Sequence, residues 1–176
     1  MNLDLQPALS HPELLAKPVA AALAEWPGEG RHEIEVAAID PDLADTAAFC
    51  EHYGVPPEES ANCVVIAARR GGETSYAACL VTAVTRADVN GVVRRRLGAR
   101  KASFAPVDDA LAATGMEYGG ITPVGLPAHW PVFVDPAVAG ASRVVVGSGV
   151  RRSKITLPGE TLSQLPGAVV VPGLGR

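Results

Sequence analysis

Two apolar runs joined by a short glycine-containing segment restrict the fold of this chain most. Cys63–Ala68 and Tyr76–Val84 consist mainly of valine, alanine and other apolar residues, a composition typical of strands in a buried sheet. Between them, Gly71-Gly72 can adopt the positive φ angles that a tight turn requires. The sequence therefore predicts an antiparallel hairpin across residues 63–84.

The other expected elements mix helices and strands without a regular βαβ repeat. Capping signals, with glycine or proline as stops, predict helices from Ser10 to about Glu25 (ended by Pro27, Gly28 and Gly30), Asp40 to Gly54, Thr85 to Gly98, Pro106 to Gly115 and Glu160 to Gln164. Strands are expected at 33–36, 102–104, 130–134, 143–147, 153–157 and 168–171. This pattern predicts one α+β domain over residues 1–176, with a mixed, mostly antiparallel sheet and flanking helices.

Composition and cysteine use favour a cytoplasmic protein. Apolar residues make up 48% of the chain but aromatic residues only 5%, so the core must be aliphatic. No apolar run approaches the roughly 18 residues of a membrane helix, and the basic-then-apolar pattern of a signal peptide is missing, so no membrane partner is expected. Cys50, Cys63 and Cys79 lie in apolar segments, which favours free buried thiols over disulfides or metal ligands.

Charge is distributed unevenly along the chain. Residues 1–60 hold 12 acidic and 2 basic side chains, whereas residues 61–176 hold 13 basic and 7 acidic ones. The basic residues form two groups: Arg86, Arg94, Arg95, Arg96, Arg100 and Lys101, and then Arg143, Arg151, Arg152 and Lys154. Such groups are either solvated faces or contacts to a polyanion such as a nucleic-acid backbone.

The segment Thr114–Gly125 is the most unusual in the chain. Within it, Gly119-Gly-Ile-Thr-Pro123 constrains the backbone without supplying a reactive side chain. One interpretation is a loop whose amide N–H groups face a carbonyl or carboxylate oxygen. The other is a tight structural turn, and the residues alone favour neither.

Other catalytic schemes have little support. The histidines His11, His32, His52 and His129 are scattered without the spacing of a zinc site, and neither a Gly-x-Ser-x-Gly elbow nor a phosphate-binding loop occurs. Cys63 begins a Val-Val-Ile run, so a core position is more plausible than a nucleophile. The sequence therefore predicts neither a metal nor a cofactor.

Five blocks in order give the chain its family resemblance. They are Glu58–Ile66, Leu97–Ala105, Thr114–Gly125, Val132–Pro136 and Val146–Leu157. Within the third, Gly119 to Pro123 fits a Gly-x-x-x-Pro loop. In these blocks the chain resembles the YbaK/ProX family of trans-acting aminoacyl-tRNA deacylases, whose fold also occurs as the editing insertion of bacterial prolyl-tRNA synthetases.

The resemblance implies hydrolysis of the ester that joins a wrong amino acid to the 3′ adenosine of tRNA, usually tRNA for proline. It implies that the loop Gly119–Pro123 holds the aminoacyl group through backbone contacts, and the residues expected around the scissile ester are Asn62, Gly119, Gly120, Thr122 and Pro123. The chain departs from the family where a lysine is common on the strand entering the pocket, because Asn62 stands there. Asparagine can hydrogen-bond a carbonyl or an amine but supplies no positive charge.

The same resemblance assigns two further sets of residues. Val64, Ile66, Ile121 and Val124 would wall a pocket for alanine- or cysteine-sized side chains, and Lys154 is either a second pocket cation or a surface lysine. The residues expected to contact the acceptor end of aminoacyl-tRNA are Arg94, Arg95, Arg96, Arg100, Lys101, Arg151 and Arg152. An aminoacyl-tRNA synthetase is a further expected partner.

Two alternatives stay open at the level of sequence. Asn62 favours a non-catalytic module of the same fold that binds tRNA or a synthetase. The generic pocket chemistry also allows a hydrolase of another small ester or amide.

Overall fold

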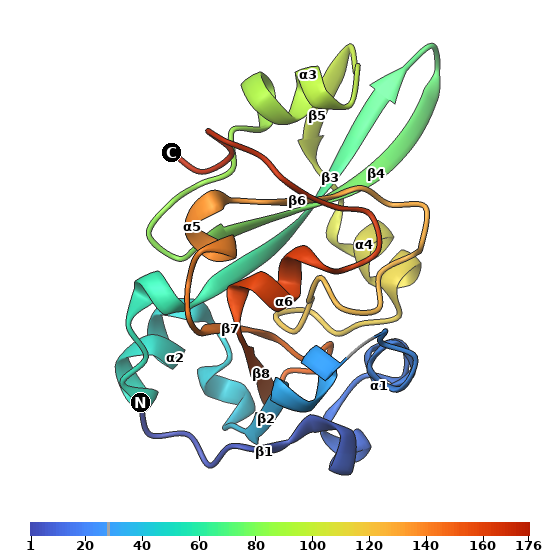
Figure 1. Cartoon of the computed structure of the whole chain (residues 1–176). Coiled ribbons are helices and arrows are strands. Elements are labelled where there is room, and N and C mark those ends of the chain that lie inside the picture. The colour runs from blue at the N-terminus through green and yellow to red at the C-terminus, as the bar shows by residue number, and fades with distance from the viewer. Residues whose placement is uncertain (28) are drawn as a thin grey trace.

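The structure is a computed structural model that describes residues 1–27 and 29–176, so Gly28, one of the expected helix stops, lies outside the described residues. Two β-sheets form the centre, and short helices surround them (Figure 1). The strands are β1 (Gln6–Pro7), β2 (Glu35–Ala38), β3 (Ala61–Arg70), β4 (Glu73–Thr82), β5 (Lys101–Phe104), β6 (Val132–Val134), β7 (Val144–Gly147), β8 (Ser153–Leu157) and β9 (Ala168–Val170). The helices are α1 (Lys17–Ala24), α2 (Thr46–Tyr53), α3 (Arg94–Arg96), α4 (Val107–Thr114), α5 (Pro136–Ala139) and α6 (Gly159–Ser163).

The sheet topology confirms the α+β prediction. One sheet has the order β1-β2-β8-β7 and is antiparallel throughout. The other has the order β5-β3-β4-β6-β9, in which β3 pairs antiparallel with β4 and β5, while β6 runs parallel to β4 and β9. A single bridge between Ser60 and Val145 joins the two sheets where β3 begins.

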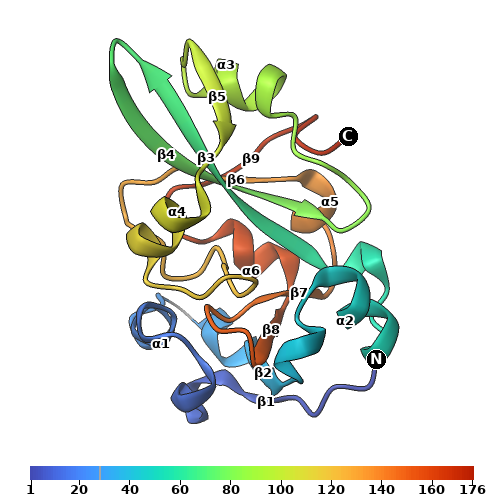
Figure 2. The same cartoon turned by 180° about the vertical axis from the view of Figure 1, so that it is seen from behind.

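The hairpin prediction is confirmed, and the hairpin is the longest feature of the fold. β3 and β4 pair over ten residues each, from Ala61 opposite Thr82 to Arg70 opposite Glu73. Its tip extends away from the rest of the molecule beside β5 and α3, as both views show (Figures 1 and 2). Residues at the base of the hairpin are therefore near the core, and residues at the tip are exposed.

The core is aliphatic, as composition requires. Its largest cluster joins α1 with both sheets, and includes the fully buried Val19, Val36 and Ile155. A second cluster lies under the hairpin and includes Ile66 and Val93. Among the described residues, no helix is long and apolar enough to cross a bilayer.

The expected helix from Ser10 to Glu25 is wrong in its first half. The chain instead forms two 3₁₀ turns, Ala8–Ser10 and Pro12–Leu14, and α1 begins only at Lys17. Backbone groups that a helix would use are engaged elsewhere, because Ala16 donates its N–H to Ser148 O and Leu14 O accepts from the Ser153 hydroxyl. Tertiary hydrogen bonds therefore outweigh the local capping signal.

The helix expected between Thr85 and Gly98 also differs. Asp88, not Thr85, is the N-cap, and its carboxylate accepts hydrogen bonds from the N–H groups of Gly91 and Val92. The first turn, Val89–Val93, is a π-helix that continues into α3. A Cβ at position 91 would collide with the Asp88 carboxylate, so glycine permits this wide turn.

A close approach between two glycine-containing segments positions the functional loop. A Cβ on Gly147 would lie 2.6 Å from the carbonyl oxygen of Ile121, and one on Gly120 would lie 2.7 Å from the carbonyl of Val150. Reciprocal hydrogen bonds hold the segments together, from Gly149 N to Gly120 O and from Glu117 N to Gly149 O. Segment 117–121 therefore lies directly against the turn that follows β7.

Replacing Gly147 by alanine should destabilise the protein by about 1–3 kcal/mol, because the added methyl group meets backbone atoms that cannot rotate away. Gly30→Ala is the matched control, since its Cβ would meet the nearest atom at an ordinary 3.5 Å. Urea denaturation of both variants measures the difference. Equal midpoints for the two variants would contradict the close approach.

Candidate active site

A cavity of about 370 Å³ lies where β3, the glycine loop, β8 and the start of α2 meet. This volume is at the lower end of the range for small-molecule sites. The cavity is lined by Ala44, Asp45, Thr46, Ala61, Asn62, Cys63, Val64, Val65, Phe104, Ala105, Val107, Ala110, Tyr118, Gly119, Ile121, Gly147 and Lys154.

One wall of the cavity is an open strand edge. β5 pairs with β3 only over Ile66–Arg69, so residues 61–65 have no strand partner on that side. The carbonyl oxygen of Val65 accepts from Ala105 N on this edge, and backbone groups alternate in direction along a strand. The N–H and C=O of Cys63 therefore point to the same edge and face the cavity.

The glycine loop forms the opposite wall, although only part of it reaches the cavity. Gly119, at φ 77°, and Ile121 line the cavity. Gly120 packs against the backbone of Val150, Thr122 is fully buried, and Pro123 lines a separate hollow near Trp26 and Trp130. The expectation that the whole loop surrounds a ligand is therefore corrected, because alternate residues of the loop face the protein interior.

Only part of the expected apolar wall reaches the cavity. Val64 and Ile121 line the cavity. Ile66 is fully buried in the cluster under the hairpin, and Val124 is fully buried in the main core. Val65 and Ala110, which belong to one small buried cluster with Trp130, complete the wall.

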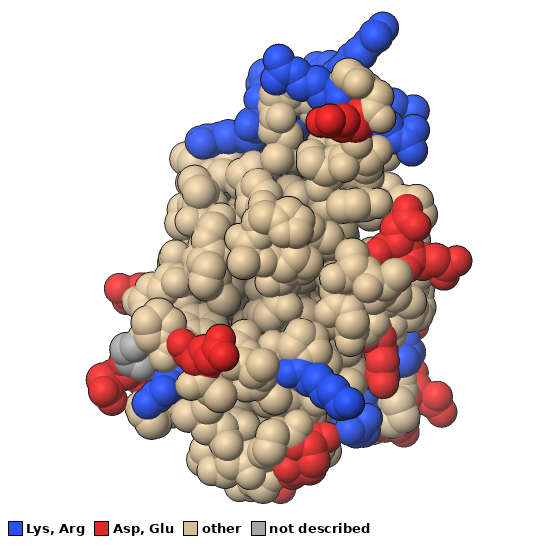
Figure 3. Space-filling view, turned by 90° about the vertical axis from the view of Figure 1, so that its right-hand side faces the viewer, with Lys and Arg blue, Asp and Glu red and all other residues tan. Residues whose placement is uncertain are grey.

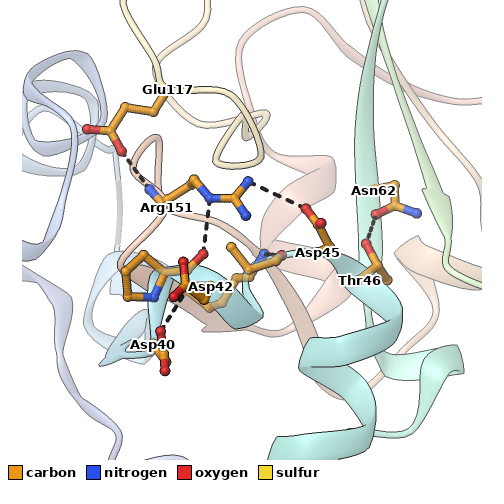
Figure 4. A network of polar contacts seen from close by, with 10 residues as sticks. Asp40, Asp42, Asp45, Thr46, Asn62, Glu117 and Arg151 are labelled. Carbon is orange, nitrogen blue, oxygen red and sulfur yellow. Dashed lines mark hydrogen bonds and ion pairs between the residues drawn. The ribbon is translucent and has the colours of Figure 1, made fainter.

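Asn62 is held at the junction of β3 and α2. Its Oδ1 accepts a hydrogen bond of 2.8 Å from the hydroxyl of Thr46, the first residue of α2 (Figure 4). This bond fixes the orientation of the amide and leaves Nδ2 available as a donor. The residue that replaces the usual lysine is therefore an oriented neutral donor.

Arg151 connects three segments around the cavity (Figure 4). Its backbone N–H donates to a Glu117 carboxylate oxygen at 2.8 Å, its Nε to Pro41 O at 3.0 Å, and its Nη1 lies 3.4 Å from Asp45 Oδ1. The guanidinium also lies over the Tyr118 ring, 6.0 Å from the centroid. Arg151 was expected to contact tRNA, whereas its observed contacts hold the cavity wall together.

Lys154 brings a positive charge into the cavity from β8. Nζ donates to Ala44 O at 3.0 Å and lies 5.1 Å from the centre of the Phe49 ring. Burial lowers the pKa of this ammonium below its usual value and the Arg151 guanidinium lowers it further, although Cys50 and Asp45 oppose the shift. An ammonium has three donors, so it keeps N–H groups beyond the one that Ala44 accepts.

Cys63 lines the cavity but is not an activated nucleophile. Burial raises the pKa of its thiol far above the usual range, and neighbouring Cys79 raises it further. Because the thiolate is the reactive form, this cysteine is inert at neutral pH. Among the described residues, no group of three His, Cys, Asp or Glu side chains is placed to hold a metal ion.

Basic side chains gather at the hairpin end of the molecule, and they include the first basic group except Arg86 (Figure 3). We call this set the basic lobe: Arg69, Arg70, Arg94, Arg95, Arg96, Arg100 and Lys101. All of these side chains are exposed, and none forms an ion pair with any residue that the structure describes. Arg69 and Arg70 were missed because they lie at the end of an apolar run, and only the pairing of Arg69 with Lys101 of β5 shows that this end of β3 belongs to the lobe.

The second basic group does not join this lobe. Arg143 pairs with Glu59 at 3.0 Å, and Arg152 donates to Glu13 O at 2.7 Å. Both lie near β7 and β8, away from α3 (Figure 1). Arg143 and Arg152 are therefore already engaged by groups within the protein.

The sequence reasoning also missed Phe104 and Tyr118, which line the mouth of the cavity while being 62% and 61% exposed. No local pattern indicates them, because Phe104 ends a short strand and Tyr118 immediately precedes the glycines. Only the meeting of β5 with the loop places the two rings at one opening.

Comparison with known proteins identifies the family. Residues 40–165 match the family model of the aminoacyl-tRNA editing domain. The chain therefore belongs to this family, and the resemblance to its YbaK type is confirmed. No curated protein matches the sequence significantly.

Solved structures share the fold. A candidate trans-editing enzyme for prolyl-tRNA synthetase has a TM-score of 0.74 and 22% identity, over 89% of this chain and 94% of that one. A hypothetical protein has a TM-score of 0.75 and 19% identity, over 88% of this chain and 99% of that one. A candidate signal transduction protein from Marinobacter aquaeolei VT8 has a TM-score of 0.56 and 17% identity, over 90% of this chain and 30% of that longer one.

The buried ammonium of Lys154 predicts a pH dependence of stability. Because the fold lowers its pKa, the unfolded chain binds this proton more tightly than the folded one. The resulting penalty is fully present below the lowered pKa and disappears as pH rises toward 10.5. Relative to Lys154→Met, the wild-type free energy of unfolding should therefore rise between pH 7 and about pH 10.

Denaturation of both proteins at several pH values measures this difference, in which the titration of groups that do not interact with Lys154 cancels. A difference that is constant, or that falls with pH, would show that Lys154 is not held in a desolvated site.

Proposed function

We propose that this protein is an aminoacyl-tRNA deacylase acting in trans on a small mischarged amino acid of alanine or cysteine size, with tRNA for proline as its substrate tRNA. One observation carries the proposal. The small cavity combines an apolar floor and two walls of backbone, and among the described residues that line it only Asn62 and Lys154 supply side-chain nitrogen donors. Membership of the aminoacyl-tRNA editing domain family supports an aminoacyl ester as the ligand of this cavity.

The cavity supports ester hydrolysis without a nucleophilic side chain. An aminoacyl ester is already activated, so a water molecule adds to its carbonyl carbon, the bond to the ribose oxygen breaks, and that oxygen takes up a proton. The neighbouring ribose hydroxyl can assist the water. Positioned donors that face the developing oxyanion lower the barrier, and the candidates are Cys63 N–H, Asn62 Nδ2 and the Lys154 ammonium.

Lys154 compensates in this proposal for the missing lysine on β3. It enters from β8 and keeps free donors near the cavity. A charge buried at a cost in stability is a feature of functional sites, since a structural lysine would avoid the desolvation. Asn62 then orients the substrate by hydrogen bonding and does not supply charge.

Cavity size accounts for selection of the amino acid. Val64, Val65, Ala110 and Ile121 leave room for a short side chain, while a larger one would clash with walls that belong to the core. The basic lobe supplies the phosphate contacts that an RNA substrate needs, and its charges have no partners among the described residues.

Incubation with alanyl-, cysteinyl- and seryl-tRNA for proline tests the proposal. We expect release of label from at least one of the three, and about a 100-fold loss of kcat in Asn62→Ala, the scale of removing one oxyanion donor. Asn90→Ala is the matched control, because Asn90 is exposed on the π-helix away from the cavity.

A second candidate is a non-catalytic module that binds tRNA or a synthetase. It is favoured by Asn62, whose side-chain oxygen is already occupied by Thr46. Full retention of label on all three tRNAs, together with measurable tRNA binding, would select this candidate and reject the deacylase.

The basic lobe predicts that tRNA affinity depends on salt. Changing Arg95, Arg96 and Arg100 together to glutamine should flatten the plot of log affinity against log salt by about 0.7–0.9 for each phosphate that the variant no longer neutralises. Lys17→Gln, an exposed lysine on α1 away from the lobe, should leave the slope unchanged. Equal slopes for the triple variant and wild type would exclude the lobe from RNA binding.

A further inference from the structure

The exposed aromatic side chains of this protein are concentrated at one place. The chain has eight aromatic residues, of which six are buried or half-buried: Trp26, Phe49, Tyr53, Tyr76, Trp130 and Phe133. The other two, Phe104 and Tyr118, are 62% and 61% exposed, and both line the mouth of the same cavity. Single exposed apolar residues are common, but two aromatic rings at one opening indicate a ligand.

Each ring is presented by a rigid support. Phe104 is the last residue of β5 and pairs with Ile66 of β3. Tyr118 has the Arg151 guanidinium over its ring, and Pro41 O and Asp45 hold that guanidinium. Neither ring contacts another aromatic side chain among the described residues. Both therefore retain exposed surface for a flat partner.

The basic lobe begins at the other end of the strand that carries Phe104. Lys101 opens β5 beside Arg69, and Phe104 closes it at the cavity. At about 3.3 Å per residue, the Cα atoms of Lys101 and Phe104 are about 10 Å apart. Along β5, the positive charge of Lys101 is therefore followed by the aromatic ring of Phe104 at the cavity.

This order matches the chemistry of an unpaired RNA end. Single-stranded nucleic acid is bound by positive charge along its phosphates and by aromatic side chains on which its bases stack. We propose that Phe104 and Tyr118 stack on the unpaired bases at the 3′ end of an RNA, while the basic lobe holds the phosphates that precede them. The inference rests on the proposed function for what occupies the cavity, but the stacking itself requires no hydrolysis.

A binding experiment tests the stacking apart from catalysis. The probe is an uncharged oligoribonucleotide with 2-aminopurine at its 3′-terminal position, whose fluorescence falls when the base stacks. With wild type we expect saturable quenching. Phe104→Ala and Tyr118→Ala should each weaken binding about tenfold and reduce the quenching, whereas Phe104→Tyr and Tyr118→Phe should restore both.

Val84→Ala is the matched control, because Val84 is 56% exposed and does not line the cavity. It should bind like wild type, and thermal melting should show all variants equally folded. Unquenched 2-aminopurine with wild type, or quenching that survives in both alanine variants, would overturn the inference. An apolar rim that docks a protein partner instead would leave the probe unquenched.

The outcomes separate the inference from the proposed function. Quenching that depends on the two rings, without release of label from any charged tRNA, would support the stacking and reject the deacylase. Release of label at wild-type rates by both alanine variants, without quenching, would support the deacylase and reject the stacking.

Discussion

The contact between the backbones of the glycine loop and the turn after β7 determines the site. Gly120 packs on Val150 and Gly147 on Ile121, at distances that leave no space for a Cβ. Because the turn is fixed by the antiparallel sheet, segment 117–121 is held against it, opposite the open edge of β3. The cavity lies between these two supports, the loop held on the turn after β7 and the edge of β3, and the Ser60–Val145 bridge joins the two sheets beside it.

The basic side chains fall into two groups with different surroundings. Around the cavity, Arg151 is bound by Pro41, Asp45 and Glu117, and Lys154 is partly desolvated, so these cations act at fixed positions. At the hairpin tip, the basic lobe is exposed and lacks acidic partners among the described residues, so its charges remain available to a mobile polyanion. β5 connects the two regions.

Local patterns predicted elements from hydrophobic period and turn chemistry, including β5, whose partner β3 is not its neighbour in sequence. The hairpin, β5 and α4 occur where the sequence placed them. The helix expected from Ser10 failed because Ala16 and Leu14 bond to the 148–153 turn, which no window of neighbouring residues reveals. Of the loop residues expected around a ligand, Gly119 and Ile121 line the cavity, but local sequence could not show which loop residues face inward.

The sequence by itself determined the α+β class, the family and the residue types of the glycine loop, because these follow from hydrophobic period, turn chemistry and motif order. Tertiary structure alone decided that Lys154 enters the cavity and that Arg151 supports its wall. It also decided that Phe104 and Tyr118 share one opening. The physical reason is that these contacts join segments from different elements, and the packing of two sheets, not propensity, sets their distances.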